Sequence, residues 1–121
     1  MEKTRLGLIG SGGMGNYHAK ILAEMDEVEI VGVCDLIEEK ARKLGETLGV
    51  KWCTDYHDLL PHVEAVWVCT EPFNRREIVI TCAKEGKHIF TEKPICNNLE
   101  DAVAMVDAAE SAGVVYMLGY C

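Results

Sequence analysis

A glycine-rich segment near the N-terminus constrains the fold of this chain more than any other stretch. A short apolar run ends at Ile9, and a helical pattern of apolar residues begins directly after the glycines. Gly10, Gly12 and Gly15 have the spacing G-x-G-x-x-G. Between a strand and a helix, the first glycine permits a tight turn, the second lets a pyrophosphate approach the backbone, and the third lets helix and strand pack closely. The segment therefore predicts dinucleotide binding, the alternative being a structural turn in another α/β domain.

An acidic residue follows at the distance that dinucleotide-binding domains show. Asp35 closes the second apolar run, about 20 residues beyond the last glycine. A carboxylate there accepts hydrogen bonds from the adenosine ribose and repels a 2′-phosphate. Leu36 and Ile37 come next, with no arginine directly after the acid, which favours NAD over NADP and leaves NADP open. The alternative reading is that Asp35 only caps the next helix.

Strand and helix patterns alternate along the whole chain. This alternation predicts an α/β fold, a doubly wound parallel sheet of Rossmann type with strand order 3-2-1-4-5-6 and helices on both faces. The expected strands cover residues 4–9, 29–34, 51–54, 65–69, 88–91 and 114–118. The expected helices cover residues 13–25, 37–48, 75–85 and 98–113, with a short helix over 55–60 that Pro61 ends. The apolar stripe is expected at Met14, Tyr17, Ile21, Leu22 and Met25 in the first helix and at Leu99, Ala102, Val103, Val106 and Ala109 in the last.

Length and charge narrow the class of protein. The 121 residues suit one domain, and the net charge of −8, without a basic cluster, argues against nucleic-acid binding. No apolar run is long enough for a membrane span, and no signal peptide is evident. The six cysteines have no metal-site spacing, so we expect no metal and reduced thiols in a cytoplasmic protein.

Ligands of such sheets lie beyond the carboxyl ends of the strands, where two further segments are expected to meet the glycine loop. Lys93, held by Pro94 just past a strand, is the candidate catalytic residue, the alternative being a plain surface lysine. The candidate cofactor-binding residues are Gly10, Gly12, Gly13, Met14, Gly15, Asp35, Leu36, Thr70, Glu71, Pro72, Glu92 and Lys93.

Three segments together resemble the Gfo/Idh/MocA oxidoreductases: residues 7–19, residues 86–94 with the motif Glu92-Lys93-Pro94, and residues 116–120. The resemblance implies an NAD(P)-dependent dehydrogenase acting on a small sugar, inositol or related polyol. It also implies that Lys93 lies near the nicotinamide and substrate with a catalytic role, that Glu92 lines the cofactor site, and that residues 70–73 lie along the cofactor.

Two departures from the family pattern bear on the interpretation. Arg75 stands where the loop motif of the family commonly has a histidine. Family members also continue into a second domain that supplies most of the substrate pocket, which is absent from this chain. We therefore expect an excised cofactor domain that binds NAD(H) without turnover, exposes surface that the second domain would cover, and is a monomer or weak dimer. A stand-alone NAD(H)-sensing module is the main alternative, and a methyltransferase a third.

Overall fold

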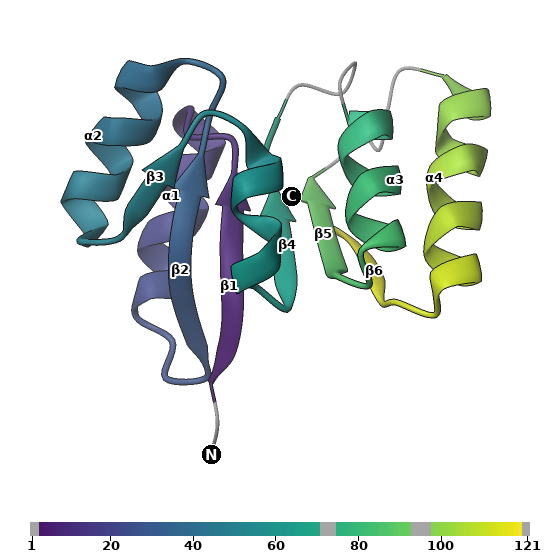
Figure 1. The fold of residues 1–121 in the computed structure, drawn as a ribbon, viewed down its shortest axis with the longest axis horizontal. Coiled ribbons are helices and arrows are strands. Elements are labelled where there is room, and N and C mark those ends of the chain that lie inside the picture. Colours follow the sequence, from purple (N-terminus) through teal and green to yellow (C-terminus); the bar gives the residue numbers. More distant parts are fainter. Residues whose placement is uncertain (1–2, 71–74, 93–97, 120–121) are drawn as a thin grey trace.

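The computed structural model describes residues 3–70, 75–92 and 98–119, which form one parallel sheet with helices on both faces (Figure 1). The six strands lie in the order β3-β2-β1-β4-β5-β6, which confirms the predicted doubly wound topology. The strands are β1 (Thr4–Ile9), β2 (Val28–Cys34), β3 (Lys51–Cys53), β4 (Ala65–Val68), β5 (His88–Glu92) and β6 (Tyr116–Gly119). The helices are α1 (Gly13–Ala23), α2 (Glu38–Leu48), α3 (Arg75–Lys84) and α4 (Leu99–Ala112), with 3₁₀ turns η1 (Tyr56–Asp58) and η2 (Leu60–His62).

Local sequence signals fix the ends of several elements. The Asn98 side chain accepts a hydrogen bond from the Asp101 N–H at 2.8 Å, the capping contact expected at the start of α4. Gly49 and Gly113 end α2 and α4 with left-handed backbones, φ +70° and +71°, which glycine adopts at least cost. Pro61 lies inside η2 instead of ending a longer helix, since the first turn of a helix needs no N–H from the proline.

Two apolar cores lie on opposite faces of the sheet. On one face α1 and α2 cover the first strands, with a buried cluster of Leu6, Leu8, Ala19, Leu22, Val33 and Leu44. On the other face α3, α4 and the 3₁₀ turns pack against the sheet, and α3 lies beside α4 (Figure 1). Burial on both faces accounts for the nearly continuous apolar sequence of the central strands.

The buried side of α1 differs from the stripe that its sequence predicts. Of the predicted stripe, Leu22 is buried whereas Tyr17, Ile21 and Met25 are exposed, and Ala19, outside the stripe, is buried as well. The reason is the close approach of α1 to the sheet. A Cβ atom on Gly15 would stand 2.0 Å from the Gly10 carbonyl oxygen, so small residues must face inward at the start of the helix.

The face that α4 buries also differs from prediction. Of the predicted stripe, Ala109 is buried whereas Leu99, Val103 and Val106 are exposed, and Met105, outside the stripe, is fully buried. The abundance of alanine in this helix leaves its rotation undetermined by periodicity alone, because several faces are equally apolar. The side chain of Met105 belongs to the core cluster that contains Ile89 and Val79.

An apolar row crosses the second half of the sheet on the face away from α3 and α4. Trp67, Phe90 and Met117 are register partners on β4, β5 and β6. The rings of Trp67 and Phe90 stack with centroids 3.8 Å apart, and the His18 ring lies against both. Met117, at the end of the row, is 59% exposed. Among the described residues, apolar surface is therefore exposed at the β6 end of this row.

The rotation of α4 is testable by two alanine substitutions. Met105 is 0% exposed and Val106 is 40% exposed. Met105→Ala should lower the free energy of unfolding by about 2–5 kcal/mol because it leaves a cavity. Val106→Ala, the matched control, should change it by about 0.5 kcal/mol or less. Urea unfolding followed by circular dichroism measures both, and the reverse order would mean that the sequence-predicted face is the buried one.

Candidate functional site

The glycine loop leaves β1 through a turn at Gly10, where only glycine adopts the backbone conformation without strain. Gly10 has φ +102°, and a Cβ atom there would lie 2.8 Å from the carbonyl carbon and oxygen of Cys69. Its N–H donates a hydrogen bond to the Cys34 carbonyl oxygen at 2.7 Å. The turn is therefore wedged between the ends of β2 and β4, at the point where the strand order reverses.

The second and third glycines have different surroundings. Gly15 is required by packing, because α1 lies against the turn. Gly12 is not: its backbone is extended, with φ −80° and ψ −159°, and an added Cβ would meet no atom of the described chain within 4 Å. Nothing within the described residues thus demands glycine at position 12. Open space beside the N-terminus of a helix fits the phosphate group that the motif predicts.

Polar contacts fix the shape of the glycine loop. The Asn16 amide Nδ2 donates hydrogen bonds to the Ser11 and Gly12 carbonyl oxygens at 2.8 and 2.9 Å. The Ser11 N–H donates to Asp35 Oδ2 at 2.8 Å. Sequence reasoning missed Ser11 and Asn16. The available signal was an asparagine in the first turn of the helix, whose short amide reaches nearby backbone groups.

The Asp35 carboxylate joins this loop to the end of β2. Its second oxygen, Oδ1, accepts a hydrogen bond from the Ile37 N–H at 2.8 Å. Asp35 therefore holds both the glycine loop, through Ser11, and the backbone at Ile37, the N-cap residue of α2, which has no side-chain cap of its own. Each carboxylate oxygen accepts more than one hydrogen bond, so both retain capacity for ribose hydroxyls.

The exit of β4 closes the other side of the loop. The Cys69 N–H donates to the Ile9 carbonyl oxygen at 2.7 Å, and Nε of the buried Arg75 donates to the Thr70 carbonyl oxygen at 3.0 Å. The Thr70 hydroxyl oxygen is buried and has no hydrogen-bond partner among the described residues. An unpaired buried hydroxyl is uncommon, and one at the edge of a cavity fits a ligand that would complete it.

One cavity of about 690 Å³ brings together several of the sequence-predicted residues: Gly10, Gly12, Asp35, Leu36 and Thr70. Its size suits a small organic ligand. Lys40, whose geometry beside Asp35 bears on the choice between NAD and NADP, also lines it, as do Tyr56 and His57, which sequence reasoning did not assign to the site. Glu71, Pro72 and Lys93 lie outside the described residues, as do the side chains of Met14 and Glu92, so their predicted roles stay predictions.

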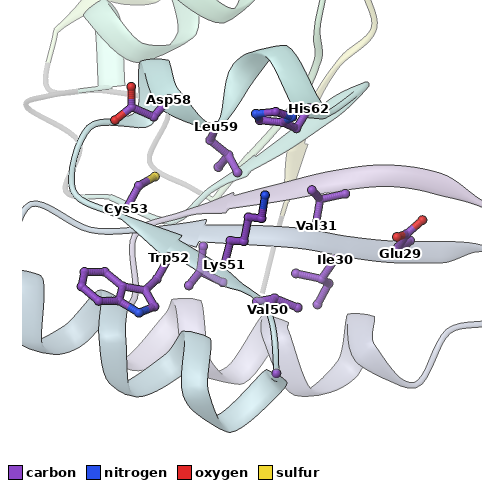
Figure 2. A pocket seen from close by; sticks show the side chains of 12 residues that line it. Glu29, Ile30, Val31, Val50, Lys51, Trp52, Cys53, Asp58, Leu59 and His62 are labelled. Carbon is purple, nitrogen blue, oxygen red and sulfur yellow. The ribbon is translucent and has the colours of Figure 1, made fainter.

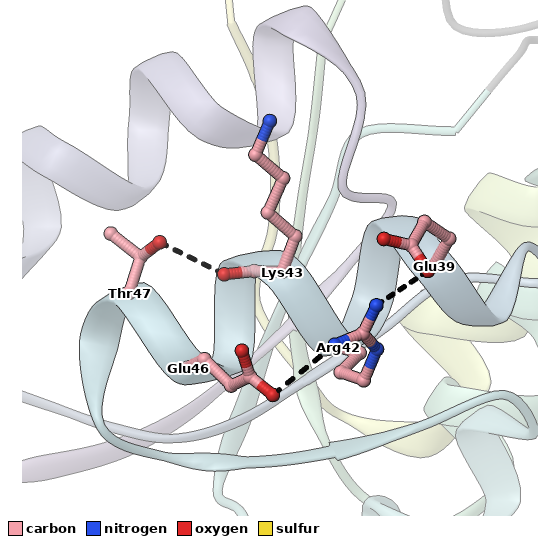
Figure 3. Close-up of polar contacts among 5 residues, drawn as sticks. All are labelled: Glu39, Arg42, Lys43, Glu46 and Thr47. Atoms are coloured by element: carbon pink, nitrogen blue, oxygen red, sulfur yellow. Dashed lines mark hydrogen bonds and ion pairs between the residues drawn. The ribbon is translucent and has the colours of Figure 1, made fainter.

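Two basic residues of α2 differ in their position relative to this cavity. Lys40 lines it, whereas Arg42, one half-turn further along α2, is engaged by two carboxylates on the same helix. Its guanidinium contacts Glu39 at 2.6 Å and Glu46 at 3.5 Å (Figure 3). These two neighbours raise the pKa of Arg42. Arg42 is thus held along the exposed side of the helix and does not line the cavity.

A second cavity, of about 530 Å³, lies along the edge where β3 pairs with β2. Figure 2 shows it between Ile30, Val50 and Trp52 on one side and Leu59 and His62 on the other. No residue of the glycine loop lines it, and neither does Asp35. Because neither the glycine loop nor Asp35 lines this cavity, we place the candidate site in the larger one.

The described cysteines and histidines add no second centre. Burial raises the pKa of the Cys34 and Cys53 thiols, which face each other across β2 and β3, and raises that of Cys82 to about 12. Cys34, Cys53 and Cys82 are free thiols. Among the described residues, no three potential ligands gather as a metal site. No helix in the described part of the chain has the length and apolar character of a membrane span.

The family comparison covers almost the whole chain. Residues 4–120 match the GFO_IDH_MocA family, described as an oxidoreductase family with an NAD-binding Rossmann fold. The chain is 39% identical over 119 residues to myo-inositol 2-dehydrogenase of Thermotoga maritima, and 30% identical over 123 residues to scyllo-inositol 2-dehydrogenase (NAD(+)) of Bacillus subtilis. These alignments cover 96% and 98% of this chain but 36% of each relative. The chain therefore spans about a third of their length.

Solved structures agree with the sequence comparison. An NAD-binding protein from Listeria innocua superimposes with a TM-score of 0.88 at 33% identity, over 97% of this chain and 35% of that one. GenD2 of gentamicin A biosynthesis, solved in complex with NAD, superimposes with a TM-score of 0.93 at 26% identity, over 98% and 35% of the two chains. The similarity again covers about a third of a longer chain.

The open space at Gly12 gives a direct test of the site. Gly12→Ala should leave the free energy of unfolding unchanged or raise it by up to about 1 kcal/mol, because the added methyl group meets nothing and restricts the unfolded chain. The same methyl group should weaken NADH binding roughly tenfold or more by blocking the approach of the pyrophosphate. Denaturant unfolding and calorimetric titration measure the two effects. Gly15→Ala is the contrasting variant, which we expect to destabilise the fold itself. Wild-type NADH affinity in Gly12→Ala would exclude a role of Gly12 in binding the pyrophosphate.

Proposed function

The chain belongs to the Gfo/Idh/MocA oxidoreductases, an NAD-binding family, and on that premise we propose that residues 1–121 are the cofactor domain of a dehydrogenase for a sugar, inositol or related polyol. The observation that carries the proposal is the empty space at Gly12, beside a helix N-terminus and within reach of the same cavity as Asp35. A glycine without a structural need and an acid at the end of β2 together fit a dinucleotide better than any other ligand considered.

The arrangement of these residues supports one orientation of the cofactor. We propose that Asp35 binds the adenosine ribose and that the pyrophosphate lies on the backbone N–H groups after Gly12. The nicotinamide half would then extend over the exit of β4, toward Thr70. The carboxylate of Asp35, with Leu36 after it, favours NAD over NADP because it repels a 2′-phosphate.

The named activities of the relatives support the substrate class. Both curated relatives described above act on inositols, which are cyclic polyols. When bound, the nicotinamide supplies the hydride chemistry. We propose that Lys93, in the motif Glu92-Lys93-Pro94, holds or moves the proton at the reacting oxygen of the substrate, and that Glu92, Glu71 and Pro72 lie along the cofactor.

The chain spans about a third of these relatives, which supports a division of roles. We propose that the 121 residues bind NAD(H) by themselves and that turnover requires a substrate domain of the kind the relatives carry. The alternative, a module that senses NAD(H) without catalysis, shares the same cofactor site and has no need of Lys93.

The role of Asp35 in cofactor choice is measurable by titration of the 121-residue chain. Wild-type protein should bind NADH roughly tenfold or more tightly than NADPH, a difference of about 1.4 kcal/mol or more. Asp35→Asn should reduce that preference several-fold, because the neutral amide no longer repels the 2′-phosphate. Asp58→Asn, an acid-to-amide change outside the cavity, is the control. An unchanged preference in Asp35→Asn would mean that another group selects the cofactor.

The role of Lys93 is measurable in a longer protein that carries this domain together with its substrate domain. Lys93→Met should lower kcat by about 10²–10⁴-fold, the usual contribution of a general acid–base group. Its NADH affinity should stay close to that of the parent, and Lys84→Met, on the exposed end of α3, should have parental activity. Full turnover in Lys93→Met would exclude the catalytic assignment, and the absence of any inositol or sugar turnover in the parent would favour the sensing alternative.

A further inference from the structure

We propose that Arg75 is a positioning residue for the nicotinamide half of the cofactor, acting through Thr70, an inference that rests on the proposed function. Arg75 opens α3 and is 4% exposed, whereas its neighbour Arg76 lies at the surface. A buried guanidinium is costly to desolvate unless its N–H groups are hydrogen-bonded. Its burial therefore calls for a hydrogen-bond acceptor close to the guanidinium.

That contact is made with the backbone at the exit of β4. Arg75 Nε donates a hydrogen bond to the Thr70 carbonyl oxygen at 3.0 Å. The bond ties the first residue of α3 to the segment that follows β4, five positions earlier in the chain. Because the guanidinium is planar and its Nε–H direction is set by the side-chain stem, one position of the Thr70 peptide is favoured.

The peptide held in this way lies against the glycine loop. A Cβ atom on Gly10 would stand 2.8 Å from the Cys69 carbonyl oxygen and 3.1 Å from the Thr70 nitrogen. The exit of β4 consequently has little freedom on the loop side, and Arg75 limits it on the helix side. A small movement of Thr70 would change the wall of the cavity that Gly10 and Thr70 share.

Thr70 is also the residue with an unsatisfied group. Its hydroxyl oxygen is buried without a hydrogen-bond partner among the described residues. Asp35 lies on the β2 side of the glycine loop and Thr70 on the β4 side, so a dinucleotide with its adenosine ribose at Asp35 brings its other half toward Thr70. The hydroxyl then gains a partner in the nicotinamide riboside, and Arg75 keeps it in place before the cofactor binds.

A matched pair of variants separates the hydrogen bond from the bulk and charge of Arg75. In Arg75→Gln the amide nitrogen occupies the place of Nε and can donate to the Thr70 carbonyl, whereas Arg75→Met has similar length and no donor. Both variants lose the charge. The measurement is the ratio of NADH affinity to ADP affinity, determined by calorimetry on the 121-residue chain, because ADP carries the adenosine and both phosphates but no nicotinamide riboside.

Arg75→Met should lower this ratio about fivefold, the usual effect of one hydrogen bond, with ADP affinity unchanged. Arg75→Gln should keep the ratio within about twofold of wild type. Thr70→Val, which removes the hydroxyl with little change of shape, should lower the ratio as Arg75→Met does. The double variant should lose no more than the worse single variant, since both changes act on one contact.

Several outcomes would overturn the proposal. Equal losses of NADH and ADP affinity in Arg75→Met would show a general structural role, and an equal drop of the ratio in Arg75→Gln would assign the effect to charge. If Arg75→Met does not fold, the other two variants decide. A wild-type ratio in Thr70→Val, or a reduced ratio in Arg75→Gln, excludes the proposal. A reduced ratio in Thr70→Val together with a wild-type ratio in Arg75→Gln supports it. Wild-type protein that binds neither NADH nor ADP would instead refute the proposed function, on which this inference depends.

Discussion

The close approach of the start of α1 to the turn after β1 determines how the rest of the site is built. Gly15 has no room for a Cβ atom because the Gly10 carbonyl oxygen occupies that space. The helix can approach the sheet this closely only with small residues inward, so Ala19 and Leu22 enter the core while Tyr17 and Ile21 stay outside. The same approach places the N-terminus of α1 over the switch point of the sheet, where an anion gains most from it.

Around this contact, the loop is held in place by protein groups alone. Asp35 binds the Ser11 N–H, Asn16 binds two loop carbonyls, and Arg75 fixes the exit of β4 against Gly10. A site whose donors are already oriented loses little entropy when a ligand binds. This preorganisation explains how a chain with net charge −8 can hold a dianionic cofactor: local N–H groups, not overall charge, provide the attraction.

The order of the strands and the residues around the glycine loop could be predicted from the sequence. The alternation of strand and helix patterns determines the sheet topology, and the spacing of the glycine motif places the loop within it. Asp35, Leu36 and Thr70 share a cavity with Gly10 and Gly12 for this reason. The buried faces of α1 and α4 could be predicted only in part, at Leu22 and Ala109. Periodicity favours large apolar residues, whereas the residues buried near Gly15 and at Met105 are decided by which side-chain sizes and shapes the packing accommodates. The contacts of Asn16 and Arg75 depend on which loops meet, which only the folded chain decides.

We propose that the cofactor lies across the glycine loop from Asp35 to Thr70. The most direct measurement is a titration of isotope-labelled protein with NADH, followed by the backbone amide signals of every residue. The largest shifts should occur at Ser11, Gly12 and Gly13, with further shifts at Ile37 and Thr70. Shifts concentrated instead at Lys51 and Trp52, in the cavity beside β3, would contradict it and place the cofactor elsewhere on the domain.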